Sequence, residues 1–134
     1  MPTIIRRSSS MLLESRREIL QAIHWQISSN AWSPPTDIYE VEPGYVIKVE
    51  IAGMSEDNFE VSIEENILII TGSRPDFPER RAYHQMEIQF GKFEIAVELP
   101  APVDVENATA GYKDGFLTIH LPRLRTNQEI EVET

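Results

Sequence analysis

The chain has 134 residues, of which 41% are hydrophobic, so it can form one packed domain but is too short for two ordinary ones. Its formal net charge of −10 disfavours nucleic acid as the main ligand, because an acidic body repels a phosphate backbone. With no cysteine, no signal peptide pattern and no run of about 20 apolar residues, we expect a soluble cytoplasmic protein without disulfides, thiolate metal sites or membrane spans.

The first predicted element is an amphipathic helix within an N-terminal arm, residues 1–33. Ser8, Ser9 and Ser10 are N-cap candidates, and apolar residues then recur at near-helical spacing. The residues of this apolar stripe are Leu12, Leu13, Ile19, Leu20, Ile23, Trp25 and Ile27. Such a stripe needs a partner in water, which can be the body of the protein, another copy of the helix, a client protein or a lipid surface. The arm holds four Arg and two Glu, a net of +2, which leaves −12 for the rest of the chain.

Beyond the arm, the spacing of apolar residues predicts strands. Pro34 and Pro35 end the helix, and from Thr36 to Pro122 the apolar period changes to two. The predicted strands, in chain order, are Tyr45–Ile51, Phe59–Ile63, Ile67–Gly72, Phe93–Leu99 and Leu117–Leu121. The third is a nearly continuous apolar run, so we expect it at the centre of a sheet and buried on both faces. Many short strands separated by Pro, Gly and Asp predict an all-β, antiparallel β-sandwich, and Asp114-Gly115 predicts a hairpin turn.

Two segments outside these strands have their own patterns. Residues 73–91 form a longer connection that is charged and proline-rich at first and then capable of a short strand. The tail, residues 123–134, is polar except for Leu124, Ile130 and Val132. Because Ile130 and Val132 are two residues apart, an extended tail places both on one face, which is typical of a ligand for a sheet edge or groove. The alternative is a C-terminal strand that completes its own sheet.

No pattern typical of a catalytic or nucleotide-binding site is present in the sequence. It lacks a Gly-rich phosphate loop, a His-Glu-x-x-His motif and a Gly-x-Ser-x-Gly motif. His24, His84 and His120 are isolated from one another, and His120 is out of phase with its apolar neighbours, so we expect it on the opposite face of its strand. We therefore expect neither an enzyme nor a protein with a cofactor or a metal site.

Several stretches, taken in order, match those of a known family. They are Pro35–Glu40, Val49–Met54, Asn66–Arg74, Phe90–Phe93 with Leu99-Pro100, and Ala110–Pro122. The last is the most specific, because it matches the pattern Ala-x-x-x-Asn-Gly-x-Leu with Asp114 at the Asn position. Together they resemble the α-crystallin domain of small heat-shock proteins of the bacterial type, and Ile130-Glu131-Val132 is similar to the tail motif of that family. The resemblance divides the chain into an arm (1–33), an α-crystallin domain (34–122) and a C-terminal extension (123–134).

The resemblance implies an immunoglobulin-like β-sandwich and an ATP-independent holdase. Such a chaperone binds partly unfolded clients, here through the apolar stripe of the arm, and holds them for ATP-driven refolding chaperones. The resemblance also implies a dimer in which the strand Ala82, Tyr83, His84, Gln85 and Met86 joins the sheet of a partner subunit. It further implies that Ile130 and Val132 dock in a groove that we assign to Phe59, Val61, Ile63, Ala108 and Ala110, which links dimers into a higher homo-oligomer. One position departs from the family, since Ile95 stands where members commonly carry Arg, and we expect an apolar contact there.

Two other functions stay open on the sequence alone. The first is a monomeric adaptor or co-chaperone of the related CS-domain type, although those relatives tend to lack an apolar pair in the tail. The second is a peripheral, membrane-associated stress protein that uses Arg6, Arg7, Arg16 and Arg17 around the apolar stripe, as a principal or a secondary role.

Overall fold

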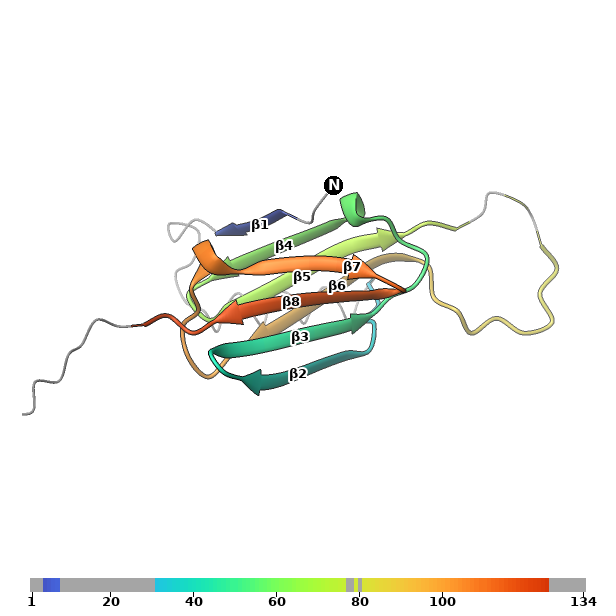
Figure 1. The fold of residues 1–134 in the computed structure, drawn as a ribbon. Coiled ribbons are helices and arrows are strands. Elements are labelled where there is room, and N and C mark those ends of the chain that lie inside the picture. Colours follow the sequence, from blue (N-terminus) through green and yellow to red (C-terminus); the bar gives the residue numbers. More distant parts are fainter. Residues whose placement is uncertain (1–3, 8–30, 77–78, 80, 126–134) are drawn as a thin grey trace, which may run out of the picture.

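The computed structural model describes residues 4–7, 31–76, 79 and 81–125, which form two four-stranded sheets packed face to face (Figure 1). One sheet has the order β1-β4-β5-β6, with strands β1 (Ile4–Arg7), β4 (Phe59–Glu64), β5 (Ile67–Arg74) and β6 (Gly91–Glu98). The other has the order β2-β3-β8-β7, with strands β2 (Thr36–Val41), β3 (Gly44–Glu50), β8 (Phe116–Pro122) and β7 (Thr109–Lys113). Two 3₁₀ turns, η2 (Glu56–Asn58) and η3 (Val105–Asn107), precede β4 and β7. The predicted all-β sandwich is confirmed, whereas the predicted helix of the arm lies outside the described residues.

The five predicted strands coincide with β3, β4, β5, β6 and β8 to within two residues at either end. β5 lies between β4 and β6, as its apolar run predicted, but its burial on both faces is incomplete because Ile69 is only half-buried. All strand pairs in both sheets are antiparallel except that β1 runs parallel to β4. Asp114 and Gly115 both have a positive φ, 53° and 85°, and join β7 to β8 in a two-residue turn. The hairpin predicted at this dipeptide is therefore present.

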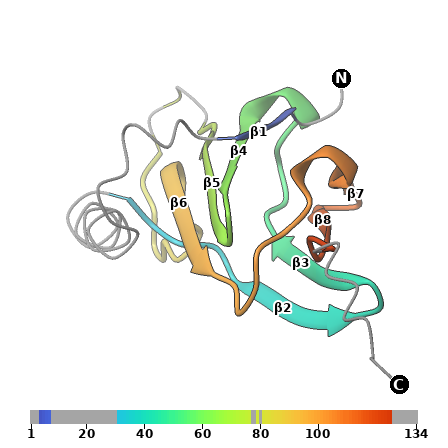
Figure 2. The same ribbon diagram turned by 90° about the vertical axis from the view of Figure 1, so that its left-hand side faces the viewer.

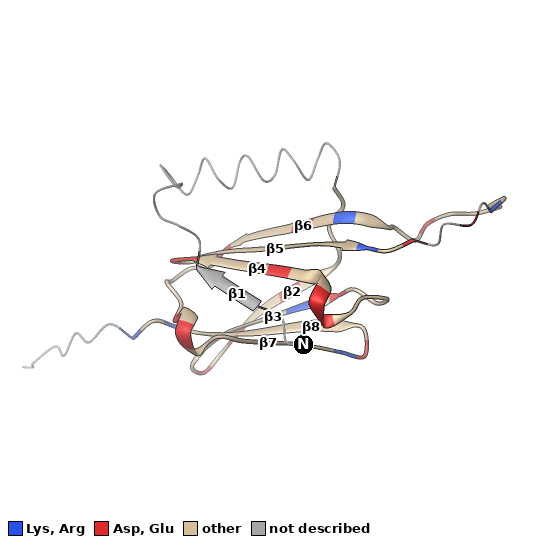
Figure 3. Ribbon diagram, turned by 90° about the horizontal axis from the view of Figure 1, so that it is seen from above, with Lys and Arg blue, Asp and Glu red and all other residues tan. Residues whose placement is uncertain are grey.

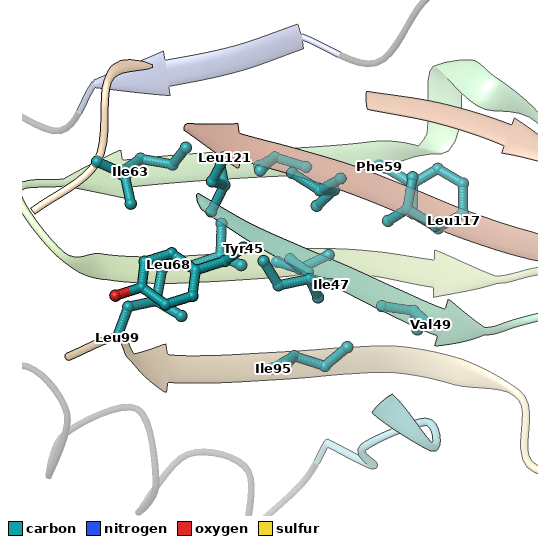
Figure 4. Packing of buried hydrophobic residues seen from close by; sticks show 14 of the residues in the cluster. Tyr45, Ile47, Val49, Phe59, Ile63, Leu68, Ile95, Leu99, Leu117 and Leu121 are labelled. Atoms are coloured by element: carbon teal, nitrogen blue, oxygen red, sulfur yellow. The ribbon is translucent and has the colours of Figure 1, made fainter. Parts of the chain in front are cut away.

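The hydrophobic core fills the space between the two sheets (Figure 4). In β8, Leu117, Ile119 and Leu121 are at most 1% exposed, whereas His120 between them is exposed, as the alternation predicted. Ile95 on β6 is 5% exposed and pairs in register with Ile70 of β5. The apolar contact that we expected at Ile95 is therefore present in the core.

The four sheet edges differ in what covers them. In the first sheet, the short strand β1 pairs with the outer side of β4. At the opposite edge of that sheet, Trp32 forms a β-bridge with Phe93 of β6. Two backbone hydrogen bonds hold this bridge, from the Trp32 amide to the Lys92 carbonyl at 3.2 Å and from the Glu94 amide to the Trp32 carbonyl at 3.0 Å. In the second sheet β2 and β7 are the edge strands, and among the described residues no further strand pairs with either.

Candidate assembly surfaces

Exposed apolar side chains gather on two segments of the molecule. Among the described residues, seven large hydrophobic side chains are exposed, and six of them belong to β2 or to the connection between β5 and β6. Those on β2 are Ile38, Tyr39 and Val41, those on the connection are Tyr83, Met86 and Ile88, and the seventh is Leu124. Single exposed apolar residues are ordinary, but a cluster on one strand and one loop is typical of an interaction surface.

The β2 edge combines these side chains with an available backbone. Its hydrogen-bonding partner on one side is β3, in a register that runs from Thr36 opposite Val49 to Val41 opposite Gly44. The backbone groups on its other side pair with no strand in the described part of the chain. A six-residue edge strand with such groups is a template on which another strand can add.

The connection between β5 and β6 extends away from the sandwich (Figure 1). Residues 81–89 are all exposed and belong to no strand within the single chain. The predicted dimer strand, Ala82–Met86, lies in this segment, and the exposed apolar residues continue past it to Ile88. The structure therefore presents the predicted strand to the outside, without a partner strand in the described residues.

Arg74 fixes the base of this connection. It is the last residue of β5, and its Nε donates a hydrogen bond to the carbonyl of Gln89 at 2.9 Å, across fifteen positions of sequence. A second donor of the same guanidinium, Nη1, reaches the carbonyl of Ala52 at 3.3 Å. The guanidinium also stacks over the rings of Trp32 and Phe90, 4.6 and 5.5 Å from their centroids. Both ends of the loop are therefore held at one side chain, beside a hollow of about 320 Å³ lined by Ala52, Gly53, Arg74, Pro75, Asp76, Ile88 and Phe90.

The residues predicted to form the tail groove lie together at the edge of β4. Phe59, Val61 and Ile63 are 5%, 1% and 0% exposed, and Ala108 and Ala110 pack half-buried against the same apolar cluster. They come from both sheets, because β4 belongs to one and Ala110 to β7 of the other. We call this place the β4 edge site.

Tyr112 of β7 ties the β4 edge site to the neighbouring connection. Its hydroxyl donates to the carbonyl of Ile51 at 2.8 Å and accepts from the amide of Met54 at 3.3 Å. Its ring packs on Phe59 with the centroids 5.3 Å apart. These contacts hold β7 beside β4 although the two strands belong to different sheets.

The β4 edge site is covered by β1, which sequence reasoning missed (Figure 2). The register places Ile4 opposite Glu60, Ile5 opposite Val61, Arg6 opposite Ser62 and Arg7 opposite Ile63. The backbone of β1 also lies close to β7 and η3. The available signal was a pair of adjacent β-branched residues, Ile4-Ile5, before the serine run, but four residues are too few to define a period. Residues 126–134 of the tail, which include Ile130 and Val132, and the predicted client-binding stripe lie outside the described residues.

Acidic residues surround the β4 edge site (Figure 3). Glu60 and Glu64 belong to β4, and Glu106 belongs to η3. The segments that can reach the site differ in charge, since β1 contains Arg6 and Arg7 whereas the last six residues of the tail contain three Glu.

Comparison with known proteins identifies the family. The profile described as the Hsp20/alpha crystallin family matches residues 37–134. The chain belongs to this family. Small heat shock protein C4 of Rickettsia felis is 41% identical over 93 residues, which cover 68% of this chain and 57% of that protein. The 22.0 kDa heat shock protein of Arabidopsis thaliana is 35% identical over 101 residues, which cover 72% of this chain and 52% of that protein.

Solved structures of the Hsp20/alpha crystallin family share the fold. The small heat-shock protein from Xylella fastidiosa, whose crystal structure is described as revealing a distinct high order structure, superposes with a TM-score of 0.63 at 27% identity. This match covers 78% of the present chain and all of that chain. The hspA protein of Xanthomonas axonopodis gives a TM-score of 0.65 at 28% identity, over 70% of this chain and 96% of that one. Both resemblances support the expected α-crystallin β-sandwich.

Membership of the Hsp20/alpha crystallin family agrees with the prediction that the protein is not an enzyme. The chain spans 57% and 52% of the length of the two curated relatives described above. Within the described residues, no helix has both the length and the hydropathy that a membrane crossing requires.

Proposed function

We propose that this protein is an ATP-independent holdase of the cytoplasm, which binds partly unfolded proteins and prevents their aggregation. The observation that carries the proposal is the match of residues 37–134 to the Hsp20/alpha crystallin family. The exposed apolar side chains on β2 and on the β5–β6 connection support the assembly described in the next paragraph. The acidic body, with a net charge of −10 for the whole chain, supports the proposal because charge keeps complexes with apolar clients dispersed. Clients bind through the apolar stripe of the arm and are passed on to ATP-driven refolding chaperones.

The basic unit of the proposed assembly is a strand-swapped dimer. The predicted strand Ala82–Met86 of one subunit adds to the β2 edge of the other. The exposed apolar side chains of this strand, Tyr83 and Met86, and Ile88 just beyond it then cover those of β2. Both halves of the contact are repeated by the twofold symmetry, because each subunit has one loop and one β2 edge. The Ile-x-Val motif of the tail, Ile130 to Val132, then binds the β4 edge site of another dimer and builds a larger oligomer.

The holdase activity is tested by suppression of aggregation. A heat-sensitive test protein is warmed with and without an excess of this protein, in the absence of ATP, and light scattering is followed. We expect scattering to fall as the chaperone is added and to be unaffected by ATP. A chain in which Leu12 and Leu20 of the arm are both changed to Ser should protect the test protein less well. Undiminished aggregation at a severalfold molar excess of the intact chain would refute the holdase.

The tail contact is tested by the mass of the assembly. Changing Ile130 and Val132 together to Ala should reduce the oligomer to dimers or small oligomers, as measured by multi-angle light scattering. Leu124→Ala is the matched control, because it removes the other apolar side chain of the tail and should leave the mass unchanged. An unchanged mass for the double variant would mean that the motif does not link subunits. A monomer near 15.4 kDa for the unaltered chain would favour the adaptor of the CS-domain type instead.

A further inference from the structure

The backbone of the β4 edge can pair with only one strand at a time. On its β5 side, β4 is already paired from Phe59 opposite Gly72 to Glu64 opposite Ile67. On its other side, β1 takes the positions from Glu60 to Ile63. A further strand that adds to β4 would need the same backbone groups, because each edge amide and carbonyl points to one side of its strand.

We propose that the N-terminal strand Ile4–Arg7 and the C-terminal tail compete for the β4 edge site, so that release of β1 is a precondition for assembly through the tail. This inference rests on the proposed binding of the tail to that site. The occupant seen in the structure is a segment of the same chain, so it acts as an internal cover of an assembly contact.

The two occupants differ in their apolar pattern. In an extended segment every second residue falls on the same face, so the pair Ile130 and Val132 falls on one face. Ile4 and Ile5 are adjacent in sequence and do not share this spacing. The hydrophobic contribution therefore favours the tail at a site formed by the buried Phe59, Val61 and Ile63.

Charge and connectivity favour the N-terminal strand. It contains Arg6 and Arg7 and pairs with an edge that carries Glu60 and Glu64, whereas the last six residues of the tail, around Ile130 and Val132, contain three Glu and no basic residue. β1 is also part of the same chain, so its effective concentration at the site does not change with protein concentration, whereas that of a tail from another subunit does. Hydrophobic burial thus favours the tail, whereas charge and connectivity favour β1. Because these contributions oppose each other, the two segments can exchange at the β4 edge site.

A reversible disulfide across β1 and β4 tests the competition. Arg6 and Ser62 are opposite in register, and the chain contains no other thiol, so Arg6→Cys with Ser62→Cys allows β1 to be locked and released. The full chain also carries Ile130→Ala and Val132→Ala, so that its own tails do not bind. Binding of a fluorescent peptide with the sequence of residues 123–134 is measured by polarisation. We expect the oxidised protein to bind the peptide at least about tenfold more weakly than the reduced protein.

The matched control places a disulfide of the same kind elsewhere. Asp37 and Lys48 are exposed and opposite in register between β2 and β3, so Asp37→Cys with Lys48→Cys should leave peptide binding independent of oxidation. Equal binding by the oxidised and reduced Arg6/Ser62 variant overturns the competition and leaves the tail contact standing. No binding in either state overturns the tail contact as well. Failure of the disulfide to form overturns the placement of β1.

A second variant releases β1 without a disulfide. In the same tail-altered chain, Ile4→Asp with Ile5→Asp should tighten peptide binding severalfold, because a site that is mostly covered lowers the apparent affinity by its uncovered fraction. Ser9→Asp with Ser10→Asp adds the same charge to the arm just beyond β1 and should not change binding. Equal tightening in both variants would attribute the effect to charge in the arm and refute the internal cover.

Discussion

Replacing Ile88 with alanine should weaken the proposed dimer without unfolding the subunit. In the single chain the side chain of Ile88 is 66% exposed, so little of it contributes to the fold of its own subunit. In the strand-swapped dimer the exposed part is covered by the partner, and alanine removes most of what is covered. The variant therefore separates the dimer contact from the stability of the sandwich.

The expected size of the effect follows from the exposed fraction. Full burial of an isoleucine side chain contributes about 1.5–3 kcal/mol, so covering two-thirds of it contributes about 1–2 kcal/mol. The dimer has two such contacts, which gives about 2–4 kcal/mol for Ile88→Ala. Because alanine retains the β-carbon, the lower part of this range is expected. At about 1.4 kcal/mol for each factor of ten, a loss of 2 kcal/mol raises the dimer Kd about 30-fold.

The assay is sedimentation equilibrium of the chain with Ile130→Ala and Val132→Ala, so that monomer and dimer are not obscured by larger assemblies. Gln89→Ala is the control, because Gln89 follows Ile88 in the same exposed segment but has no apolar side chain to cover. A dimer Kd that changes less than about threefold for Ile88→Ala, or equally for Gln89→Ala, would refute the strand-swapped contact.

Three further predictions concern stability and are measured by urea unfolding followed by tryptophan fluorescence. Gly44→Ala should destabilise the subunit by about 3 kcal/mol, because a β-carbon at Gly44 would lie 2.0 Å from the carbonyl oxygen of Leu121. Gly111→Ala should be neutral or slightly stabilising, because a β-carbon at Gly111 would have no other heavy atom within 4 Å. Equal effects of the two glycine substitutions would contradict this reasoning. Asn66→Ala should cost about 1–3 kcal/mol, since it removes a buried donor 2.6 Å from the Leu99 carbonyl, and a loss below 0.5 kcal/mol would count against it. Tyr112→Phe keeps the ring contact but removes the hydroxyl bonds, so a loss of about 1 kcal/mol is expected, and an unchanged midpoint would mean that water replaces them.

Alternation of apolar residues located the strands that have one clearly buried face. β4 shows why, since Phe59, Val61 and Ile63 are buried and Glu60 between them is exposed. β2 carries no such signal, because Ile38, Tyr39 and Val41 are all exposed at the edge of its sheet. Because neither face of β2 is buried in the single chain, its sequence does not alternate between apolar and polar residues in the way that revealed the other strands.

The candidate sites were predictable to different degrees. The alternation predicted that Phe59, Val61 and Ile63 share the buried face of β4, whereas their role as a groove for the tail stays a prediction. The pairing of β1 with that strand was not predicted, because a parallel contact between residues more than fifty positions apart depends on the assembled sandwich. The dimer strand Ala82–Met86 stays a prediction, since its proposed partner is a second subunit.

The anchoring of the loop at Arg74 limits how far one subunit can reach toward another. Arg74 holds the carbonyl of Gln89, fifteen positions later, so the intervening chain must go out and return to one point. Its reach is about half its contour length, or roughly 25 Å at about 3.4 Å per residue. In the proposed dimer the partner's β2 must therefore lie within this distance of Arg74. The loop acts as a tether of fixed length, and the number of residues between Arg74 and Gln89 sets the spacing of the two sandwiches.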